Sequence, residues 1–252
     1  MSGHSKWSTI KRKKAMMDAK KGQLFTKLGR EIAVAARKGG GDPETNFALR
    51  LAIERAKRAN MPKETIERAI KRGTGELKGR ELEEVIYEGY GPHGIALMVQ
   101  VLTDNRNRTV ADIRRILTRH NGSLGESGCV AWLFEPKGLI SIESNDKDPE
   151  ELALLAIDAG ADDVQIDDDG FVQVFTKPDD FQWVKEALER QNIPLLSAEI
   201  SMVPKTVMKL DEKATIQNMR LIEALESLDD VQQIYSNLDI SDEVMAKYEG
   251  GE

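Results

Sequence analysis

Lysine and arginine side chains are concentrated in the first 80 residues, where they could bind phosphate groups. Residues 1–80 contain 21 Lys or Arg and 8 Asp or Glu, whereas residues 81–252 contain 15 and 35. The corresponding net charges are +13 and −20. A positive field of this size attracts polyanions. The sequence therefore predicts a nucleic-acid-binding surface formed by Lys11, Arg12, Lys13, Lys14, Lys20, Lys21, Lys27, Arg30, Arg37, Lys38, Arg50, Lys57 and Arg58.

A charge run of this kind has a second interpretation, in which the cations only solvate the helices that carry them. That interpretation predicts Glu and Asp interspersed among the cations. The later part of the chain shows this mixture, and the first 80 residues largely lack it. The composition therefore favours an outward-facing cationic surface.

A second group of arginines lies inside the acidic part of the chain. Residues 105–120 contain five Arg and one acidic residue, Asp112. Arginine forks and Asn amides at the start of a helix are good ligands for phosphate or carboxylate. We expect a second anion site there, and local pairing with neighbouring carboxylates is an equal alternative. The residues concerned are Arg106, Arg108, Arg115 and Arg119.

Two short motifs resemble known binding sites, but their context favours turns. Gly89 to Gly94 matches G-x-G-x-x-G, yet a strand-like run follows it where a dinucleotide site requires a helix. Gly170 to Phe175 resembles the aromatic strand of RNA-recognition modules. Three aspartates, residues 167–169, precede it and would repel phosphate. We expect hairpin turns at both positions.

No pattern in the sequence indicates catalysis, a metal site or a cofactor. The three histidines are far apart, and Cys129 is the single cysteine, which we expect to be a buried and unreactive thiol. No signal peptide or apolar run of membrane-spanning length is present, so we expect a cytoplasmic protein without a membrane partner. The alternative class is an enzyme with a cleft between the acidic domains.

Helices must position the N-terminal cations. Apolar residues recur at helical spacing from Leu24 to Ala36, with cations on the opposite arc. Three glycines and Asp42-Pro43 end this helix, and Pro62 opens a later one. The expected helices are a short one from Ser8 toward Lys21, then Lys20–Lys38, Glu44–Asn60 and Pro62–Gly73.

Past residue 80 the pattern changes to strands alternating with helices. We expect strands at Val85–Tyr90, Ile95–Thr103 and Cys129–Phe134, with a helix at Thr109–His120. A self-contained βαββαβ set follows, which is the ferredoxin-like order. Its elements are Leu139–Ile142, Pro149–Ala159, Asp163–Ile166, Phe171–Thr176, Asp179–Gln191 and Leu195–Ile200.

The last helix and strand, Lys213–Leu228 and Val231–Tyr235, lack a local partner and can complete the interrupted first set. The expected fold class is therefore α+β, with a helical domain and two ferredoxin-like α/β domains, one inserted in the other. The expected domains are residues 1–78, residues 79–136 plus 204–240, and residues 137–203. The tail from Ser241 is expected to be frayed.

Several motifs together resemble one family. They include Gly3-His4-Ser5-Lys6-Trp7, Ala59-Asn60-Met61-Pro62, Tyr87-Glu88-Gly89-Tyr90-Gly91-Pro92 and Asp104-Asn105-Arg106-Asn107-Arg108-Thr109. In this respect the chain resembles YebC-type proteins, a family that includes the mitochondrial translational activator of cytochrome c oxidase subunit I. The match covers nearly the whole chain.

The resemblance implies three domains and a non-enzymatic role in the cytoplasm. Members are described as DNA-binding transcriptional regulators, or as ribosome-associated factors that help translation. We therefore expect a nucleic-acid-binding regulator of gene expression that acts on DNA. The alternative is a translation factor that binds ribosomal RNA or tRNA. The acidic domains are expected to face a basic protein surface.

Overall fold

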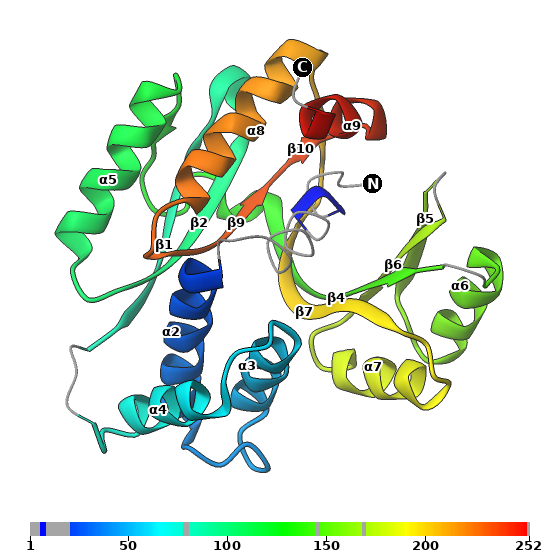
Figure 1. Cartoon of the computed structure of the whole chain (residues 1–252). Helices are drawn as coiled ribbons and strands as arrows, with labels where there is room; N and C mark the ends of the chain where they lie inside the picture. The colour runs from blue at the N-terminus through cyan, green and yellow to red at the C-terminus, as the bar shows by residue number, and fades with distance from the viewer. Residues whose placement is uncertain (1–5, 9–20, 78–80, 145–146, 168–169, 251–252) are drawn as a thin grey trace.

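The fold is seen in a computed structural model that describes residues 6–8, 21–77, 81–144, 147–167 and 170–250. Within these residues, three helices make up most of the N-terminal part, and two antiparallel four-stranded sheets with covering helices form most of the rest (Figure 1). The predicted α+β fold class is confirmed. No helix among the described residues is long and apolar enough to cross a membrane.

The helical part consists of α2 (Lys21–Gly39), α3 (Phe47–Arg58) and α4 (Lys63–Gly73). Its core contains Ile32, Leu49 and Ala56, so the predicted apolar arc of α2 is confirmed. Asn46 caps α3 by accepting from the backbone N–H of Leu49 at 3.1 Å, as an N-cap side chain does. Of the short helix expected between Ser8 and Lys21, residues 9–20 lie outside the described part of the chain.

Helix α4 approaches α2 closely at its last residue, Gly73. A Cβ atom at this position would lie 2.3 Å from the carbonyl oxygen of Ala33 and 2.8 Å from the Ala36 Cβ. The backbone oxygen cannot move away without distorting α2, so only glycine permits this close contact. This contact sets which side of α4 is turned away from the core.

The first sheet has the strand order β3-β1-β2-β9. Its strands are β1 (Glu83–Tyr90), β2 (Ala96–Thr103), β3 (Ser123–Leu124) and β9 (Val231–Ser236). Helices α5 (Arg106–Arg119) and α8 (Glu212–Glu226) pack on one face (Figure 1). About a hundred residues separate β3 from β9 in the sequence, yet both strands belong to this sheet, so the unit is interrupted, as predicted. We call it the split sheet.

The order of elements along the split sheet differs from the βαββαβ expectation. The chain runs ββαβαβ, yet the order in space is that of a ferredoxin-like sheet, with β1 in the place of the third strand. The turn between β1 and β2 contains the short 3₁₀ helix η1 (Pro92–Gly94), with His93 at φ 64° and Gly94 at φ 82°. The predicted hairpin is therefore confirmed.

The strand expected at Cys129–Phe134 is wrong. Residues 128–131 wrap around the Glu88 carboxylate, and the 3₁₀ helix η2 (Ala131–Leu133) leads into β4, which begins at Phe134. The apolar run packs as a loop against the split sheet, and apolar character alone does not separate a buried loop from a strand. Cys129 is only half-buried, and its burial raises the pKa of the thiol.

The inserted sheet has the order β5-β6-β4-β7, which is the ferredoxin-like order that was predicted. Val172 of β6 and Phe181 of α7 belong to the core between its strands and helices. Phe171 and Phe175 are also buried, and Gly170 at φ 75° forms the predicted hairpin turn. The elements are β4 (Phe134–Glu143), α6 (Pro149–Asp158), β5 (Asp163–Ile166), β6 (Phe171–Thr176), α7 (Phe181–Arg190) and β7 (Leu195–Pro204).

As far as Gly250, the described C-terminal tail is helical and packed, contrary to the expectation of fraying. After the parallel pair β8 (Met208–Lys209) and β10 (Leu238–Asp239), helix α9 covers Asp242–Gly250. Val244 and Met245 are buried in the same core as Trp7, whose ring meets that of Tyr248 edge-on at 6.3 Å. The partner that orders this tail comes from the other end of the chain, so local sequence does not reveal it.

Candidate nucleic-acid interface

Helix α2 turns most of its described cations toward the rest of the protein. Lys27 Nζ donates to the carbonyl of Glu226 at 2.6 Å, and Arg37 lies 3.0 Å from Glu81. Lys38 pairs with Glu84. These contacts fasten the helical part to the split sheet. Lys21, at the start of α2, is exposed, whereas Lys11, Arg12, Lys13, Lys14 and Lys20 lie outside the described residues.

Arg30 enters a cluster centred on the Asp230 carboxylate. Arg30 Nη1 lies 2.6 Å from Asp230 Oδ1, and Arg108 Nη2 lies 2.7 Å from Oδ2. The Thr109 hydroxyl donates to the same Oδ2 at 2.6 Å, and Thr103 lies at 3.3 Å. We call Arg30, Arg108, Thr109 and Asp230 the Asp230 cluster. It joins α2, the start of α5 and the turn before β9.

Electrostatics favour the ionised form of Asp230. Burial is the strongest single influence and raises the pKa of Asp230. Hydrogen bonds from Arg108, Thr109 and Arg30 together outweigh it and lower the pKa to about 2. Charge-assisted hydrogen bonds of this kind stabilise a carboxylate strongly. The Asp230 cluster is therefore a structural ion cluster that holds two parts of the chain together.

The second predicted anion site is largely satisfied by the chain itself. Asn105 caps α5 by accepting from the Arg108 N–H at 3.1 Å, which places the arginines at the start of the helix. Arg106 pairs with Glu83 at 2.6 Å, and Arg115 with Asp112 at 3.1 Å. Arg119 is exposed, and within the described residues it forms no ion pair. Local pairing thus accounts for Arg106, Arg108 and Arg115.

The remaining predicted cations lie on α3. Arg50 is partly buried with its guanidinium 6.0 Å from the centre of the Phe47 ring. Arg58 approaches Glu189 of α7 at 3.9 Å, which is a long distance for an ion pair. Lys57 is exposed and has no ion-pair partner among the residues that the structure describes. Only the end of α3 therefore offers its charge to solvent.

A set of cations on α4 was missed by the sequence analysis. Arg68, Lys71 and Arg72 are spaced i, i+3 and i+4, so they share one face of the helix. All three are exposed, and none forms an ion pair within the described parts of the chain. Ile66, Ala69 and Gly73 occupy the buried face. The helical wheel of α4 would have revealed this arrangement.

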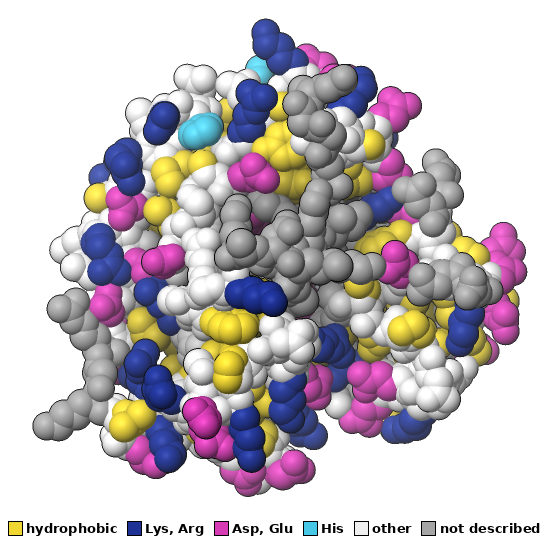
Figure 2. All heavy atoms as spheres, in the orientation of Figure 1, with side chains coloured by type: hydrophobic (Ala, Val, Ile, Leu, Met, Phe, Trp, Pro, Cys, Tyr) yellow, Lys and Arg dark blue, Asp and Glu magenta, His cyan; other side chains and the backbone are white. Residues whose placement is uncertain are grey.

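The α4 cationic face, defined as Arg68, Lys71 and Arg72, lies on the second half of α4, whose last residue Gly73 packs against α2. Figure 2 shows Lys and Arg side chains over α3 and α4 along the lower edge, mixed with Asp and Glu. The exposed acids of α4 are Glu64 and Glu67, and Glu67 already approaches Lys63 at 3.8 Å. The net charge of this surface remains positive, which favours binding of an anionic polymer.

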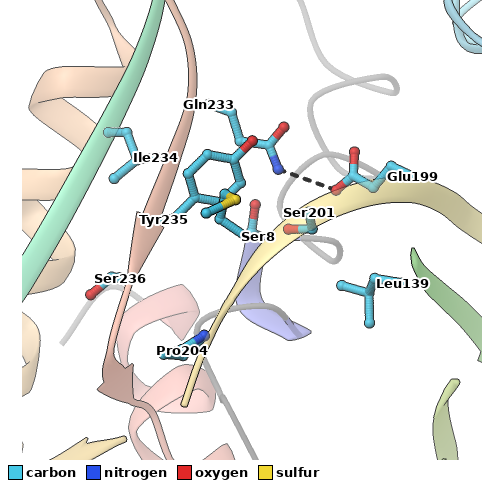
Figure 3. A pocket seen from close by; sticks show the side chains of 10 residues that line it. Ser8, Leu139, Glu199, Ser201, Pro204, Gln233, Ile234, Tyr235 and Ser236 are labelled. Atoms are coloured by element: carbon cyan, nitrogen blue, oxygen red, sulfur yellow. Dashed lines mark hydrogen bonds between the residues drawn. The ribbon is translucent and has the colours of Figure 1, made fainter. Parts of the chain in front are cut away.

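The junction of the two sheets is closely packed. Figure 3 shows a narrow hollow between β7 and β9, where Gln233 donates to Glu199 at 3.3 Å. Its volume is about 10 Å³, enough for a single water, whereas small-molecule sites measure about 300–1,000 Å³. Elsewhere in the described ranges, no three His, Cys, Asp or Glu side chains are grouped so that they could hold a metal ion.

Lys6 and Trp7 are further residues whose role the sequence did not show. Lys6 Nζ lies 2.5 Å from Asp167 of the inserted unit and 2.8 Å from Asp242 of α9. Trp7 is 2% exposed within the core of the split sheet. These two residues connect the start of the chain to the inserted unit and the C-terminal helix. In the sequence they were notable only as part of a family motif.

A helical domain with exposed cations, followed by two ferredoxin-like sheets, defines a three-part α+β protein of a known class. The crystal structure of a conserved hypothetical protein, Aq1575 from Aquifex aeolicus, superimposes with a TM-score of 0.83 at 50% identity. The match covers 89% of this chain and 93% of that one. The arrangement of parts is therefore shared with a solved structure.

Two domain models of one family match the chain. Residues 5–76 match the TACO1/YebC protein N-terminal domain, and residues 82–238 match the TACO1/YebC second and third domain. The chain belongs to the TACO1/YebC family. The earlier resemblance is confirmed.

Relatives that are similar over nearly their whole length are named as probable transcriptional regulatory proteins. The "probable transcriptional regulatory protein" of Persephonella marina is 55% identical over 248 residues, covering 98% of this chain and 99% of the relative. The protein of the same name from Pelotomaculum thermopropionicum is 55% identical over 244 residues, covering 96% and 100%. These names support a regulatory protein.

Proposed function

We propose that this protein is a non-enzymatic regulator of gene expression that binds DNA through the α4 cationic face, with the exposed Lys57 of α3 as a further contact. The observation that carries the proposal is the spacing of Arg68, Lys71 and Arg72 on the exposed side of α4. Unlike Lys27, Arg30, Arg37 and Lys38, these cations are not used to join parts of the chain. The name shared by the relatives makes DNA the favoured polymer.

The binding should be mainly electrostatic. We expect the guanidinium and ammonium groups of this face to contact phosphates, and phosphate contacts carry no sequence information. The affinity should therefore fall steeply as salt is added, because each neutralised phosphate releases counterions. We expect little sequence preference from this face alone.

Charge reversal of the α4 cationic face tests the proposal. In the variant Arg68→Glu, Lys71→Glu, Arg72→Glu, the affinity for a 30-base-pair DNA duplex should fall sharply. The slope of log K against log salt should become less steep by about 3, because each lost phosphate contact removes about 0.9. Fluorescence anisotropy titrations at several salt concentrations measure both quantities.

A matched control changes the same total charge at exposed lysines elsewhere. Lys147→Glu, Lys177→Glu, Lys213→Glu should retain nearly the wild-type affinity and salt slope. Equal affinity of the α4 variant and the wild type would overturn the site assignment. If the wild type binds a ribosomal RNA fragment but no DNA duplex, then DNA as the partner is refuted.

A further inference from the structure

The loop between β3 and β4 is built around one buried carboxylate. Glu88 of β1 is 7% exposed, and its Oε1 accepts from the Gly128 N–H at 2.7 Å. Its Oε2 accepts from the N–H groups of Val130 and Ala131, each at 2.8 Å. Burial, the largest influence, raises the pKa of Glu88, but the three backbone donors outweigh it and lower the pKa overall. The ionised carboxylate therefore fixes the shape of this loop.

The fixed loop and the last residue of β1 each present an aromatic ring at the surface. Trp132 Nε1 donates to the Cys129 carbonyl at 3.1 Å, and the Tyr90 hydroxyl donates to the same oxygen at 3.1 Å. A carbonyl oxygen has two lone pairs, so it can satisfy both donors. Trp132 is nevertheless 66% exposed, and Tyr90 is 37% exposed. Their polar atoms are bound internally, which leaves apolar ring surface facing solvent.

A cation stands beside the tryptophan. Lys205 Nζ donates to the Trp132 carbonyl at 3.1 Å, and the Lys205 backbone N–H donates to Leu133 at 2.8 Å. Lys205 is exposed, so its ammonium group can also meet an anion in solvent. One carboxylate is nearby on the same loop: after burial and the charge of Glu88, the charge of Glu126 also raises the pKa of the Cys129 thiol.

The size and surroundings of this surface indicate what it can bind. The exposed residues of the segment between α5 and η2 are polar or glycine, namely Asn121, Ser123, Glu126, Ser127 and Gly128, whereas Ala131 and Leu133 beside Trp132 are partly exposed. Two exposed rings with this limited apolar border are smaller than the apolar centre of a typical protein interface. The two rings offer an area the size of a single planar group, and the adjacent ammonium group of Lys205 can bind a phosphate. Rings next to cations are the recurring elements of single-strand binding sites.

We propose that Trp132 and the adjacent Tyr90 form a stacking site for an unpaired nucleobase, and that Lys205 binds the phosphate next to that base. The site rests on the proposed nucleic-acid function and extends it, because it selects single-stranded or locally opened polymer. Stacking on a ring face tolerates any base, so the site favours unpaired over paired nucleic acid without reading sequence.

Tryptophan fluorescence tests the proposal directly. In a Trp183→Phe background, Trp132 is the exposed tryptophan and Trp7 is buried. Adding a 20-nucleotide single strand of dT should quench Trp132, whereas the matching blunt duplex should quench it much less. Trp132→Ala in the otherwise wild-type chain should weaken single-strand binding at least about fivefold, and Trp132→Phe should recover most of the loss.

The salt dependence separates the two parts of the site. Trp132→Ala should leave the salt slope for the single strand unchanged, because stacking releases no counterions. Lys205→Gln should make that slope less steep by about 0.7, the value for one phosphate of a single strand. The inference is overturned if Trp132→Ala binds the single strand as tightly as the wild type does.

The outcome is distinguishable from that of the α4 experiment. If duplex binding depends on the α4 cationic face while Trp132→Ala has no effect on single-strand binding, the proposed function stands and this inference fails. If the single strand quenches Trp132 while the α4 variant binds the duplex normally, the stacking site stands and the α4 assignment fails. Absence of quenching by dT, together with wild-type affinity of Trp132→Ala, would refute the stacking site alone.

Discussion

Replacing Asp230 with alanine should lower the free energy of unfolding by about 3 kcal/mol. The change leaves the partly buried guanidinium of Arg30 without its carboxylate and removes one of the acceptors of Arg108 and of Thr109. Breaking a buried ion pair by removing one partner typically costs about 3–5 kcal/mol. We take the lower end because the Arg108 side chain is 44% exposed. Urea unfolding followed by circular dichroism measures the change.

The neighbouring Asp229 provides a matched control. Its side chain is exposed and accepts one hydrogen bond from Gln23 at 3.3 Å. Asp229→Ala should therefore change the free energy of unfolding by no more than about 0.5 kcal/mol. An Asp230→Ala loss as small as that of Asp229→Ala would show that the Asp230 cluster does not stabilise the fold.

The contribution of Asp230 should also depend on pH. Its pKa is lowered from 3.8 to about 2, so the ionised carboxylate stabilises the folded state above about pH 4. That stability is lost as the pH falls from about 4 through 2. A shift of nearly two units corresponds to about 2 kcal/mol. The stability difference between the wild type and Asp230→Asn should shrink by this amount over that range.

Replacing Trp7 with alanine should cost about 3–5 kcal/mol of unfolding free energy. Trp7 is 2% exposed in the main core and contacts the ring of Tyr248. Removing a large buried aromatic side chain loses its transfer free energy and leaves a cavity. Because Tyr248 lies on α9, we also expect the C-terminal helix to lose protection. Hydrogen exchange of residues 242–248 measures that loss.

Trp183 is the natural control for Trp7. It is 64% exposed, and its ring contacts the guanidinium of Arg190 at 5.7 Å. Trp183→Ala should therefore cost less than about 1 kcal/mol. If Trp7→Ala is no more destabilising than Trp183→Ala, then the start of the chain does not anchor the core.

Periodicity predicted most of the elements because their patterns are local. The helical wheel of Leu28, Ile32 and Ala36 indicated the buried face of α2, and the structure confirms it. The βαββαβ order of the inserted sheet also follows from short segments. The C-terminal helix α9 was missed because its burial depends on Trp7, more than two hundred residues away.

The strand assigned to Cys129–Phe134 failed for a related reason. Its apolar residues are compatible with either a strand or a buried loop. The loop is selected by the Glu88 carboxylate, which binds three backbone N–H groups. A single distant charge therefore decided the local conformation.

By itself the sequence determined the fold class, the interruption of one sheet by another and the separation of charge between the two ends of the chain. Composition and periodicity carry these features because they average over many residues. Only the tertiary structure decided which cations are used internally. Arg30 and Arg68 belong to the same basic region, yet Arg30 binds Asp230 and Arg68 faces solvent. The reason is that an ion pair depends on a partner brought close by folding, and no count of charges along the chain contains that distance.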